Sequence, residues 1–434
     1  MKKVKIISAI LTVCLIISFS FKDAPSSGNI IDPAKEITLD KPSLTYTQIP
    51  VGPKASGPPS ADEIKRVSIS AVGDLMVHTW QMNDAYVKET GEYDFSNDFE
   101  MVKKYLDRSD YRVGNLETVF GGKEIGYSDY PMFNTPDSFG EAIKEAGFDL
   151  LTTANNHSLD KKEAGLLRTL DVLDRLDIEH VGTYRSEEER NTYKIVEVNG
   201  LKLAFLSYTY GTNGIPVPKG KDYLINILNE ELILKDLNEV KKLEPDMIIV
   251  MPHIGNEYEL YPKEIFKRWI GLMVDNGADI VLASHPHVLQ PMEIKEVEEE
   301  DGSRRQAFII YSLGNFISSQ RTEPRDQGII LNLEISKLNG NKAIIEKVSF
   351  IPTWVQFRDL SGKDYVRVLS VYDALKDYEN GINNNLRPKD IERLKRVHSS
   401  VTGIYLEKEV PLAEMKPEYI FYENTANLNY DSLS

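Results

Sequence analysis

One apolar run that ends in two histidines most constrains how this chain can fold. Residues 280–283 are apolar, and Ser-His-Pro-His follows at positions 284–287. Such a run predicts a strand that is buried on both faces, as in a parallel sheet, and open α/β sheets carry their sites at the carboxyl ends of such strands. His285 and His287 would share one face if the segment stayed extended, and neighbouring imidazoles suit a metal ion. The pair alone is weak evidence, because two polar residues can simply begin a loop.

Polar side chains also follow the other apolar runs of the sequence. Four of the seven histidines come directly after such runs, which random placement would not produce. The residues in these positions are Asp74, His78, Asn115, Glu117, Asn156, His157, Asp160, His253, Glu257, His285, His287 and Asn315. Any one of them could have a plainer role; Asp74, for example, could cap a helix. Taken together, carboxylate, amide and imidazole groups favour a site for two Mn, Fe or Zn ions over a calcium site or a cysteine-rich zinc site.

Predicted strands and helices alternate along the middle of the chain. Helical apolar spacing covers residues 138–146, 166–176, 230–242 and 263–276, with short strands between them. This order predicts an α/β fold with a largely parallel, layered sheet. Residues 193–210 predict a hairpin that turns at Asn199-Gly200. Further on, residues 328–335 and 343–357 predict a hairpin covering a sheet edge, and residues 389–398 a helix.

The first part of the sequence has the composition of a secretory segment. Three lysines precede residues 6–21, which carry no charge, and no small-x-small cleavage site follows. We therefore predict a signal or membrane anchor at residues 1–21, with an uncleaved anchor favoured over a cleaved signal. Proline and serine in residues 22–65 predict a flexible linker. We expect a folded domain at residues 66–360 and a helical extension with a polar tail at 361–434.

Charge and cysteine content narrow the possible functions. The formal net charge is −16, with 51 basic and 67 acidic residues, which argues against nucleic acid as a partner. The one cysteine, Cys14, lies in the apolar leader, so the folded domain cannot form a disulfide. An anionic ligand would need either metal ions or a local basic groove, and the sequence does not locate such a groove.

The motifs occur in an order that resembles a known family. They are Gly-Asp, Gly-Asn-x-Glu, Asn-Asn-His-x-x-Asp, Pro-His-x-Gly-x-Glu, Ser-His-Pro-His and Ser-Leu-Gly-Asn-Phe, spread over residues 67–330. In this order they resemble the bacterial poly-γ-glutamate capsule biosynthesis proteins (CapA/PgsA type), a branch of the calcineurin-like metallophosphoesterase superfamily. The resemblance implies a four-layer α/β/β/α sandwich with a dinuclear metal site at the strand ends.

The resemblance also implies a role for each site residue. Asp74 and His287 would bind the first metal, Glu117 would bridge, and Asn156, His253 and His285 would bind the second. His157 would be the general acid or transition-state donor. The groups around them, in contact with these residues or the substrate, would be His78, Asn115, Asp160, Glu257 and Asn315. The superfamily pattern at the first motif is Asp-x-His, but the third position of this motif here is Met76. A methionine thioether is a poor ligand for a hard divalent ion. Either His78 completes the first site, or that site is one ligand short, with consequences for its occupancy or for ordinary phosphoesterase chemistry; the plainer interpretation is that Met76 packs under the sheet.

The resemblance implies a protein tethered to the outer face of the cell membrane, or secreted if the signal is cleaved. It would support synthesis, export or attachment of poly-γ-glutamate or a related anionic polymer, beside a membrane-bound polymer synthase. Its chemistry would be that of a metal-dependent hydrolase-like protein. Two alternatives stay open: a secreted metal-dependent phosphohydrolase of nucleotides or other phosphoesters, and a non-catalytic scaffold that binds polymer or synthase.

Overall fold

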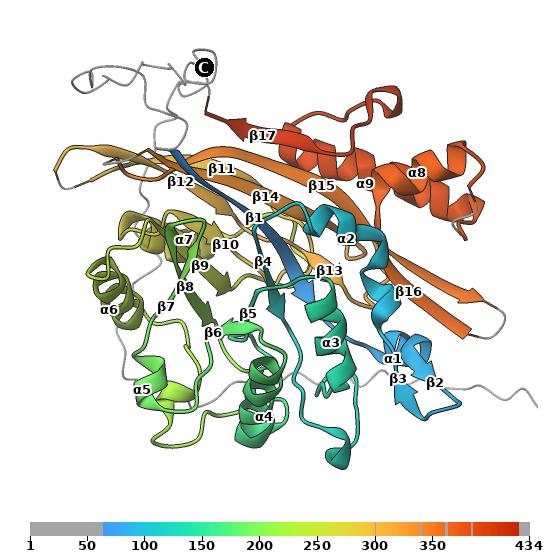
Figure 1. The fold of residues 1–434 in the computed structure, drawn as a ribbon, viewed down its shortest axis with the longest axis horizontal. Helices are drawn as coiled ribbons and strands as arrows, with labels where there is room; N and C mark the ends of the chain where they lie inside the picture. Colours follow the sequence, from blue (N-terminus) through green and yellow to red (C-terminus); the bar gives the residue numbers. More distant parts are fainter. Residues whose placement is uncertain (1–63, 300, 339–340, 361–362, 383–384, 425–434) are drawn as a thin grey trace, which may run out of the picture. The chain divides into compact units, whose positions relative to one another are not determined.

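Two β-sheets face each other in the computed structural model, which describes residues 64–299, 301–338, 341–360, 363–382 and 385–424 (Figure 1). The expected anchor at 1–21 and nearly all of the expected linker lie outside these ranges. β1 begins at Ile64, two residues before the expected start of the domain. No helix within the described ranges is long and apolar enough to cross a bilayer.

The first sheet has nine strands, in the order β16-β15-β14-β1-β4-β5-β6, with β13 also paired to β1 and β17 to β15. Its strands are β1 (Ile64–Leu75), β4 (Tyr111–Leu116), β5 (Leu150–Thr152), β6 (Glu179–Val181), β13 (Asn315–Ile317), β14 (Gln327–Leu338), β15 (Ile344–Leu360), β16 (Lys363–Ser370) and β17 (Tyr419–Glu423).

The second sheet has six strands, in the order β11-β12-β10-β9-β8-β7. They are β7 (Lys194–Val198), β8 (Leu201–Thr209), β9 (Met247–His253), β10 (Ile280–Leu282), β11 (Met292–Glu298) and β12 (Arg304–Ile310), and a separate short pair is formed by β2 (Tyr86–Val87) and β3 (Glu92–Tyr93). The helices are α1 (Thr79–Ala85), α2 (Glu100–Leu106), α3 (Asp137–Glu145), α4 (Lys162–Arg175), α5 (Glu187–Arg190), α6 (Glu230–Lys241), α7 (Glu264–Asp275), α8 (Val371–Glu379) and α9 (Pro388–Leu406).

Both sheets have a parallel centre, as the alternation of strands and helices predicts. β1, β4, β5 and β6 run parallel, and so do β8, β9, β10 and β12. The predicted hairpin is β7 and β8, joined at Asn199 and Gly200, whose φ angles of 50° and 80° suit a two-residue turn. Parallel strands bring their carboxyl ends to one edge of a sheet, so the polar residues after them converge.

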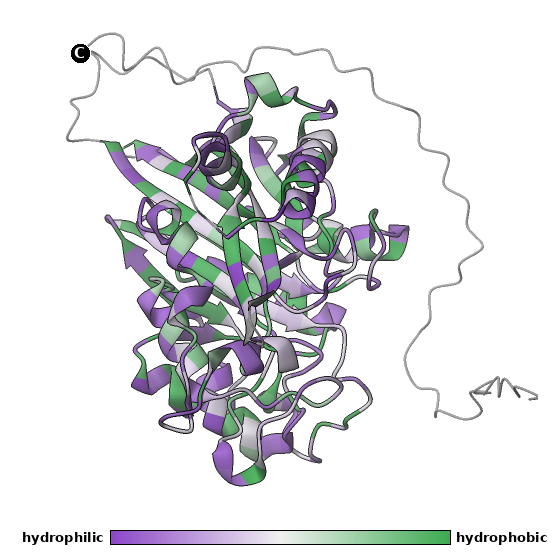
Figure 2. Cartoon of the chain, turned by 90° about the vertical axis from the view of Figure 1, so that its right-hand side faces the viewer, coloured by the Kyte–Doolittle hydropathy of each residue, from purple (hydrophilic) through white to green (hydrophobic). Residues whose placement is uncertain are grey.

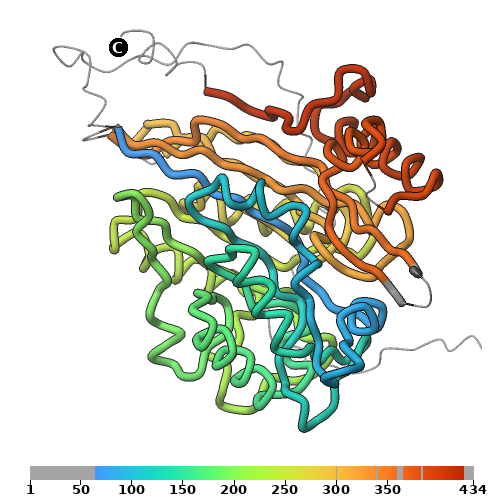
Figure 3. The backbone as a smooth tube through the Cα atoms, turned by 45° about the vertical axis from the view of Figure 1, so that its right-hand side comes forward, coloured from blue at the N-terminus to red at the C-terminus, as the bar shows by residue number. Residues whose placement is uncertain are grey.

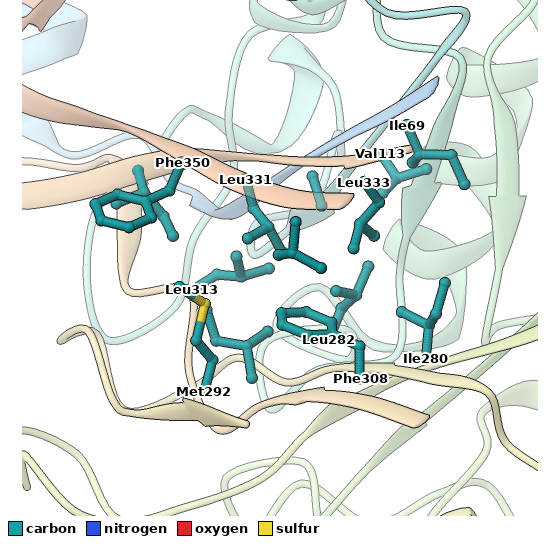
Figure 4. Packing of buried hydrophobic residues seen from close by; sticks show 14 of the residues in the cluster. Ile69, Val113, Ile280, Leu282, Met292, Phe308, Leu313, Leu331, Leu333 and Phe350 are labelled. Carbon is teal, nitrogen blue, oxygen red and sulfur yellow. The ribbon is translucent and has the colours of Figure 1, made fainter. Parts of the chain in front are cut away.

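Three apolar clusters separate the layers. The largest lies between the sheets, where Leu331 and Leu333 of β14 face Leu282 of β10 (Figure 4). A second cluster packs α2, α3 and α4 on the outer face of the first sheet, and a third packs α6 and α7 on the outer face of the second. Hydrophobic residues follow the strands and the inward helix faces, with hydrophilic residues outside (Figure 2). The expected α/β/β/α sandwich is therefore confirmed.

The C-terminal region departs from the expected domain boundary. The expected boundary between residues 360 and 361 falls between β15 and β16, which pair with each other along their length. α9 packs Leu394 and Val397 into the cluster between the sheets, and β17 adds Tyr419 to it. Figure 1 shows α8, α9 and β17 alongside β15. The described residues after 361 are thus part of the same compact unit, because apolar side chains of β15 pack in the same cluster as those of α9.

Two further expectations change in detail. The hairpin predicted from residues 328–335 and 343–357 is β14 and β15, but β14 pairs with β1 inside the sheet and does not cover an edge. α9 continues eight residues beyond the predicted helix end, to Leu406. Its buried positions Ile391, Leu394, Val397, Val401 and Tyr405 keep helical spacing over the whole length.

Candidate metal centre

The ends of the parallel strands bring the predicted site residues together. Asp74 lies in β1, next to Asn115 in β4 on one side and Asn315 in β13 on the other. Glu117 follows β4, and His253 is the last residue of β9. The tube in Figure 3 shows how β1, in blue, runs beside the orange strands from the other end of the domain.

Glu117 belongs to two groups of potential metal ligands. Asp74, Glu117 and His287 have ligand atoms within 4.8 Å of one another, and so do Glu117, His253 and His285. The Nδ1 atom of His287 is 3.0 Å from Oδ2 of Asp74. Oε1 of Glu117 lies 3.6 Å from Nε2 of both His253 and His287. All five side chains are buried, and Glu117 is placed to bridge the two groups.

Asn156 and Glu257 extend this arrangement. Oδ1 of Asn156 lies 2.8 Å from Nε2 of His253, so the amide oxygen points at the second group. Glu257 forms a third group with His285 and His287, again with ligand atoms within 4.8 Å, but it is exposed while both histidines are buried. Asn156 lies where the sequence predicts a ligand, and Glu257, expected as a supporting or substrate-contacting group, also belongs to a group of potential ligands.

The electrostatics of the centre favour a bound cation. Burial raises the pKa of Glu117 well above its ordinary value, and the neighbouring Asp74 carboxylate raises it further. Burial lowers the pKa of His253 well below its usual range, and lowers that of His285 to about 3. Within the described residues, neither oxygen of Glu117 nor Nδ1 of His285 has a hydrogen-bond partner. Neutral imidazoles with lone pairs beside unpaired carboxylate oxygens fit a divalent transition metal.

Hydrogen bonds from neighbouring residues hold the ligands in place. Nδ2 of Asn115 donates to Oδ1 of Asp74 at 2.8 Å and lies 3.2 Å from Nδ1 of His253. Oδ1 of Asn315 is 3.1 Å from Nδ1 of His287. Such partners fix the orientation of a ligand ring. The structure therefore places Asn115 and Asn315 around the candidate ligands, where the sequence interpretation puts them.

His157 is oriented by Asp160. The His157 Nδ1–H donates to Oδ2 of Asp160 at 2.8 Å, and the same oxygen accepts from the backbone N–H of Phe133 at 2.7 Å. The Phe133 ring also meets the imidazole edge to face, with centroids 4.7 Å apart. Nε2 of His157 is left directed toward Nδ2 of Asn213, at 3.5 Å. A buried imidazole whose Nδ1–H is held by a carboxylate, and whose Nε2 has only this long contact with Asn213, is suited to proton transfer.

Met76 and His78 occupy the weak part of the predicted first site. Met76 is buried, and its backbone joins β13 through a hydrogen bond to the carbonyl of Ile317. Nδ1 of His78 accepts from the backbone N–H of Ser319 at 3.2 Å, and burial lowers its pKa to about 4. His78 belongs to none of the ligand groups found among the described residues.

A Met76→His variant is expected to bind metal more tightly at the Asp74 group. The added imidazole would supply a direct ligand where water otherwise completes the shell, and we expect an affinity gain of about tenfold or more at that site. Titration calorimetry of wild type and variant would measure it. An unchanged isotherm would mean that another group already completes the first site.

The backbone of the histidine pair differs from the extended segment considered above. His285 and His287 have φ angles of 103° and 57°, so both lie in the left-handed region that side chains rarely adopt. Pro286, between them, packs against Gly255, where an added Cβ would come within 2.7 Å of Cγ of the proline. The bend, and not an extended strand, brings the two imidazoles to the centre.

A second close approach sets the position of Asp74. A Cβ on Gly73 would lie 1.8 Å from the carbonyl oxygen of Gly314, so no other residue fits here without moving the backbone. The Asp74 N–H donates to the same carbonyl at 2.9 Å. The glycines of the Gly-Asp and Gly-Asn motifs therefore join the two strands that bring Asp74 and Asn315 together.

Three residues at the centre escaped the sequence interpretation. The Tyr210 ring lies 4.5 Å from that of His285, between centroids, and the Ser284 hydroxyl is 2.9 Å from Nδ1 of His253. Asn213 lies between Asn156 and His157. Tyr210 follows β8 directly, so the signal that located the other residues, a polar residue after an apolar strand, was also present there.

The sequence profile of the family described as bacterial capsule synthesis protein PGA_cap matches residues 68–320, more than half of the chain. The chain belongs to this family. The match confirms the resemblance that the order of motifs indicates, and it includes all of the candidate ligands named above.

Two relatives in this capsule synthesis family cover most of the same region. The capsule biosynthesis protein CapA of Bacillus anthracis is 29% identical over 287 residues, or 64% of this chain and 66% of the relative. The PGA biosynthesis protein CapA of Bacillus subtilis (strain 168) is 29% identical over 270 residues, or 61% of this chain and 67% of the relative. The chain thus spans about two thirds of the length of these relatives.

Solved structures with similar folds include phosphoesterases and nucleotidases. NAD nucleotidase (NadN) of Haemophilus influenzae superposes with a TM-score of 0.43 and 14% identity, covering 77% of this chain and 60% of that one. The calcineurin-like phosphoesterase YfkN of Bacillus subtilis superposes with a TM-score of 0.36 and 12% identity, covering 80% of this chain and 100% of that one. Both TM-scores lie below 0.5, so membership of the capsule synthesis family rests on the sequence match.

Proposed function

We propose that this protein supports the synthesis, export or attachment of poly-γ-glutamate or a related anionic capsule polymer, through a dinuclear metal site. The observation that carries the proposal is Glu117, which is buried, lacks a hydrogen-bond partner among the described residues, and is shared by two groups of ligands. Membership of the capsule synthesis family supplies the biological context. One relative is named for biosynthesis of PGA, and we extend that substrate to this chain as part of the proposal.

In this proposal, some residues of the centre would bind the metal ions and His157 would transfer a proton. Asp74, Glu117 and His287 would hold one ion, and Glu117, Asn156, His253 and His285 the other, with Mn, Fe or Zn suited to these donors. Two such ions would supply Lewis acidity for hydrolytic or transfer chemistry. His157, oriented by Asp160, would give a proton from Nε2 to a leaving oxygen when both ring nitrogens carry a proton, and the Asp160 carboxylate would stabilise that charged form.

Tethering to the outer face of the membrane is part of this proposal. Its support is the lysine-led apolar segment at residues 1–21 and the proline-rich stretch after it. A tether would keep the domain at high effective concentration beside a membrane-bound synthase, even where direct contact is weak. Cleavage of the segment would instead release the protein, and fractionation of cells into membrane and medium separates the two cases.

A metal-dependent phosphohydrolase is the second candidate. The observation that favours it is the buried pair of His157 and Asp160 beside two ligand groups, which suits the departure of a phosphoester oxygen. The two candidates share the same residues and differ in the substrate. Turnover of nucleotides by the purified protein, with no change of polymer on deletion, would decide for the phosphohydrolase.

Replacing His157 with Ala is expected to slow polymer production by about 100-fold if the imidazole is a general acid. The experiment uses a capsule-forming strain in which the variant is the sole copy, with polymer yield, chain length and membrane location as readouts. His180→Ala is the matched control, because His180 lies in β6 and pairs with Asp174, away from the ligand groups. Polymer that persists in His157→Ala but disappears on deletion of the domain would mean that the protein acts as a scaffold.

A further inference from the structure

A loop after β13 lies directly beside the metal centre. This loop, residues 318–326, is held from the side of the centre by Asn315, whose Nδ2 donates to the carbonyl of Arg325 at 3.0 Å and to Oε1 of Gln320 at 3.3 Å. Oδ1 of the same Asn315 contacts the candidate ligand His287 at 3.1 Å. One side chain thus links the loop to the centre.

The loop's two acids point toward α9. Asp326 is buried and accepts a hydrogen bond from Nε of Arg393 at 3.0 Å and another from Nε1 of Trp354 at 2.8 Å. Glu323 pairs with Arg396 at 2.6 Å and with Arg393 at 3.3 Å. Both negative charges of the loop are therefore paired with arginines of α9.

The loop's two arginines have aromatic partners instead. Cζ of Arg325 lies 3.4 Å from the ring centroid of Tyr258, and Cζ of Arg321 lies 4.1 Å from that of Trp80. Among the described residues, neither arginine lies within 4.0 Å of a carboxylate. Stacking holds the plane of a guanidinium and leaves its edge N–H groups free to bind an anion.

These arginines lie close to the ligand groups. The Tyr258 ring under Arg325 has its centroid 6.1 Å from that of His287. Trp80, under Arg321, belongs to α1, whose N-cap is His78, and the backbone of Ser319 in the loop donates to that same His78. Arg321 is exposed and Arg325 is half-buried, so both can meet a ligand from solvent.

The overall charge of the protein makes local positive groups useful for binding an anion. The protein as a whole carries a formal charge of −16, so an anionic chain that approaches the site meets overall repulsion. Positive groups beside the ligands offset this repulsion locally. A planar guanidinium also matches an oxyanion with two parallel hydrogen bonds.

We propose that Arg321 and Arg325 form an anion clamp that binds carboxylates of the polymer on either side of the position that reacts. The clamp rests on the proposed function, because it assigns the substrate class of that same centre. Phosphate shares the oxyanion geometry that the clamp recognises, so the experiment includes it as a separate ligand. α9 acts as a positioning element, because it takes both acids of the loop away from the two arginines.

The test measures binding of an end-labelled γ-linked glutamate oligomer to the full-length protein in detergent. The variants are Arg321→Gln, Arg325→Gln and the double substitution. Arg321→Lys and Arg325→Lys are added because lysine keeps the positive charge but lacks the planar guanidinium that can donate two parallel hydrogen bonds. Arg304→Gln is the control, since Arg304 is an exposed arginine of β12 that pairs with Glu296. Each Gln variant is expected to raise Kd about tenfold, the loss of one charge-assisted contact. The Kd values of the Lys variants should lie between those of wild type and the Gln variants, and the Kd of Arg304→Gln should match that of wild type.

Companion ligands define the chemistry. A γ-linked isoglutamine oligomer, in which each α-carboxylate is replaced by a carboxamide and the chain end is amidated, is expected to bind weakly and equally to all variants. If inorganic phosphate binds wild type but not the double variant, while the glutamate oligomer binds neither, the clamp stands and its ligand is phosphate. A double variant that melts like wild type and binds both anions with unchanged Kd would overturn the clamp.

Metal content measured on the same samples separates this proposal from the previous one. The arginine variants should keep the metal of wild type. Loss of oligomer binding with metal retained supports the clamp. Suppose that the wild-type protein contains no metal but binds the oligomer, and that the double variant does not bind it. This result would refute the metal centre and leave the clamp in place.

Discussion

A His285→Ala variant is expected to lose the metal of the centre. His285 belongs to two of the three ligand groups and is buried, and its Nδ1 has no hydrogen-bond partner among the described residues. Truncation removes a donor that no neighbour replaces, so metal affinity should fall by about 100-fold or more, beyond what loss of a supporting residue alone causes. Elemental analysis of the purified full-length protein and the variant measures this directly.

The control for this experiment is the His180→Ala substitution described above. It removes an imidazole of the same size and should leave metal content unchanged. Equal metal in His285→Ala and wild type would show that the histidine is not a ligand. Negligible metal in both proteins, after growth with added Mn, Fe and Zn, would contradict the metal centre as a whole.

Replacing Arg393 with Met is expected to be the most destabilising of the substitutions considered. Arg393 and Asp326 form a bidentate pair in which both side chains are buried. Removal of the arginine leaves a buried carboxylate with only Trp354 as a donor, and broken pairs of this kind cost about 3–5 kcal/mol. Urea unfolding followed by circular dichroism would measure the change in the free energy of unfolding.

Arg396→Met is the matched control, on the same helix and next to the same loop. Its partner Glu323 and Arg396 itself are about half exposed, so the loss should be about 1 kcal/mol or less. Two variants with the same loss of stability would contradict the distinction between the buried and the exposed pair. If Arg393→Met is destabilised but keeps its metal, the loss of stability arises in the loop and α9 and not at the metal centre.

The layered fold and the strand-end residues were predictable because their signals are local. An apolar run such as that before His285 identifies a buried strand within a few residues, and the next polar residue marks its exit. The same reading located Glu117 and His253 and ordered them in one site. Tyr210 shows that the rule extends further than the prediction took it.

The features that the prediction missed depend on partners distant in sequence. The bend at Pro286 requires Gly255 opposite it, and no pattern within the Ser-His-Pro-His segment indicates a positive φ. The position of α9 in the fold depends on the pairing of β15 with β16. The hydrophobic pattern of the sequence does not specify which strands pair. The roles of Asp326 and Glu323 depend on arginines 67 and 73 residues further along the chain.

That separation imposes an order on the production of the protein. The ribosome makes β1, with Asp74, at the start of the domain, whereas Arg393 and Arg396 emerge more than three hundred residues later. Until α9 has been synthesised, both acids of the loop lack their partners and are free to fold back on Arg321 and Arg325. A nascent or prematurely terminated chain would therefore contain every metal ligand and still handle an anionic polymer poorly. If Arg321 and Arg325 bind the polymer as proposed, completion of the C-terminal helix is the last step by which the protein would gain that affinity.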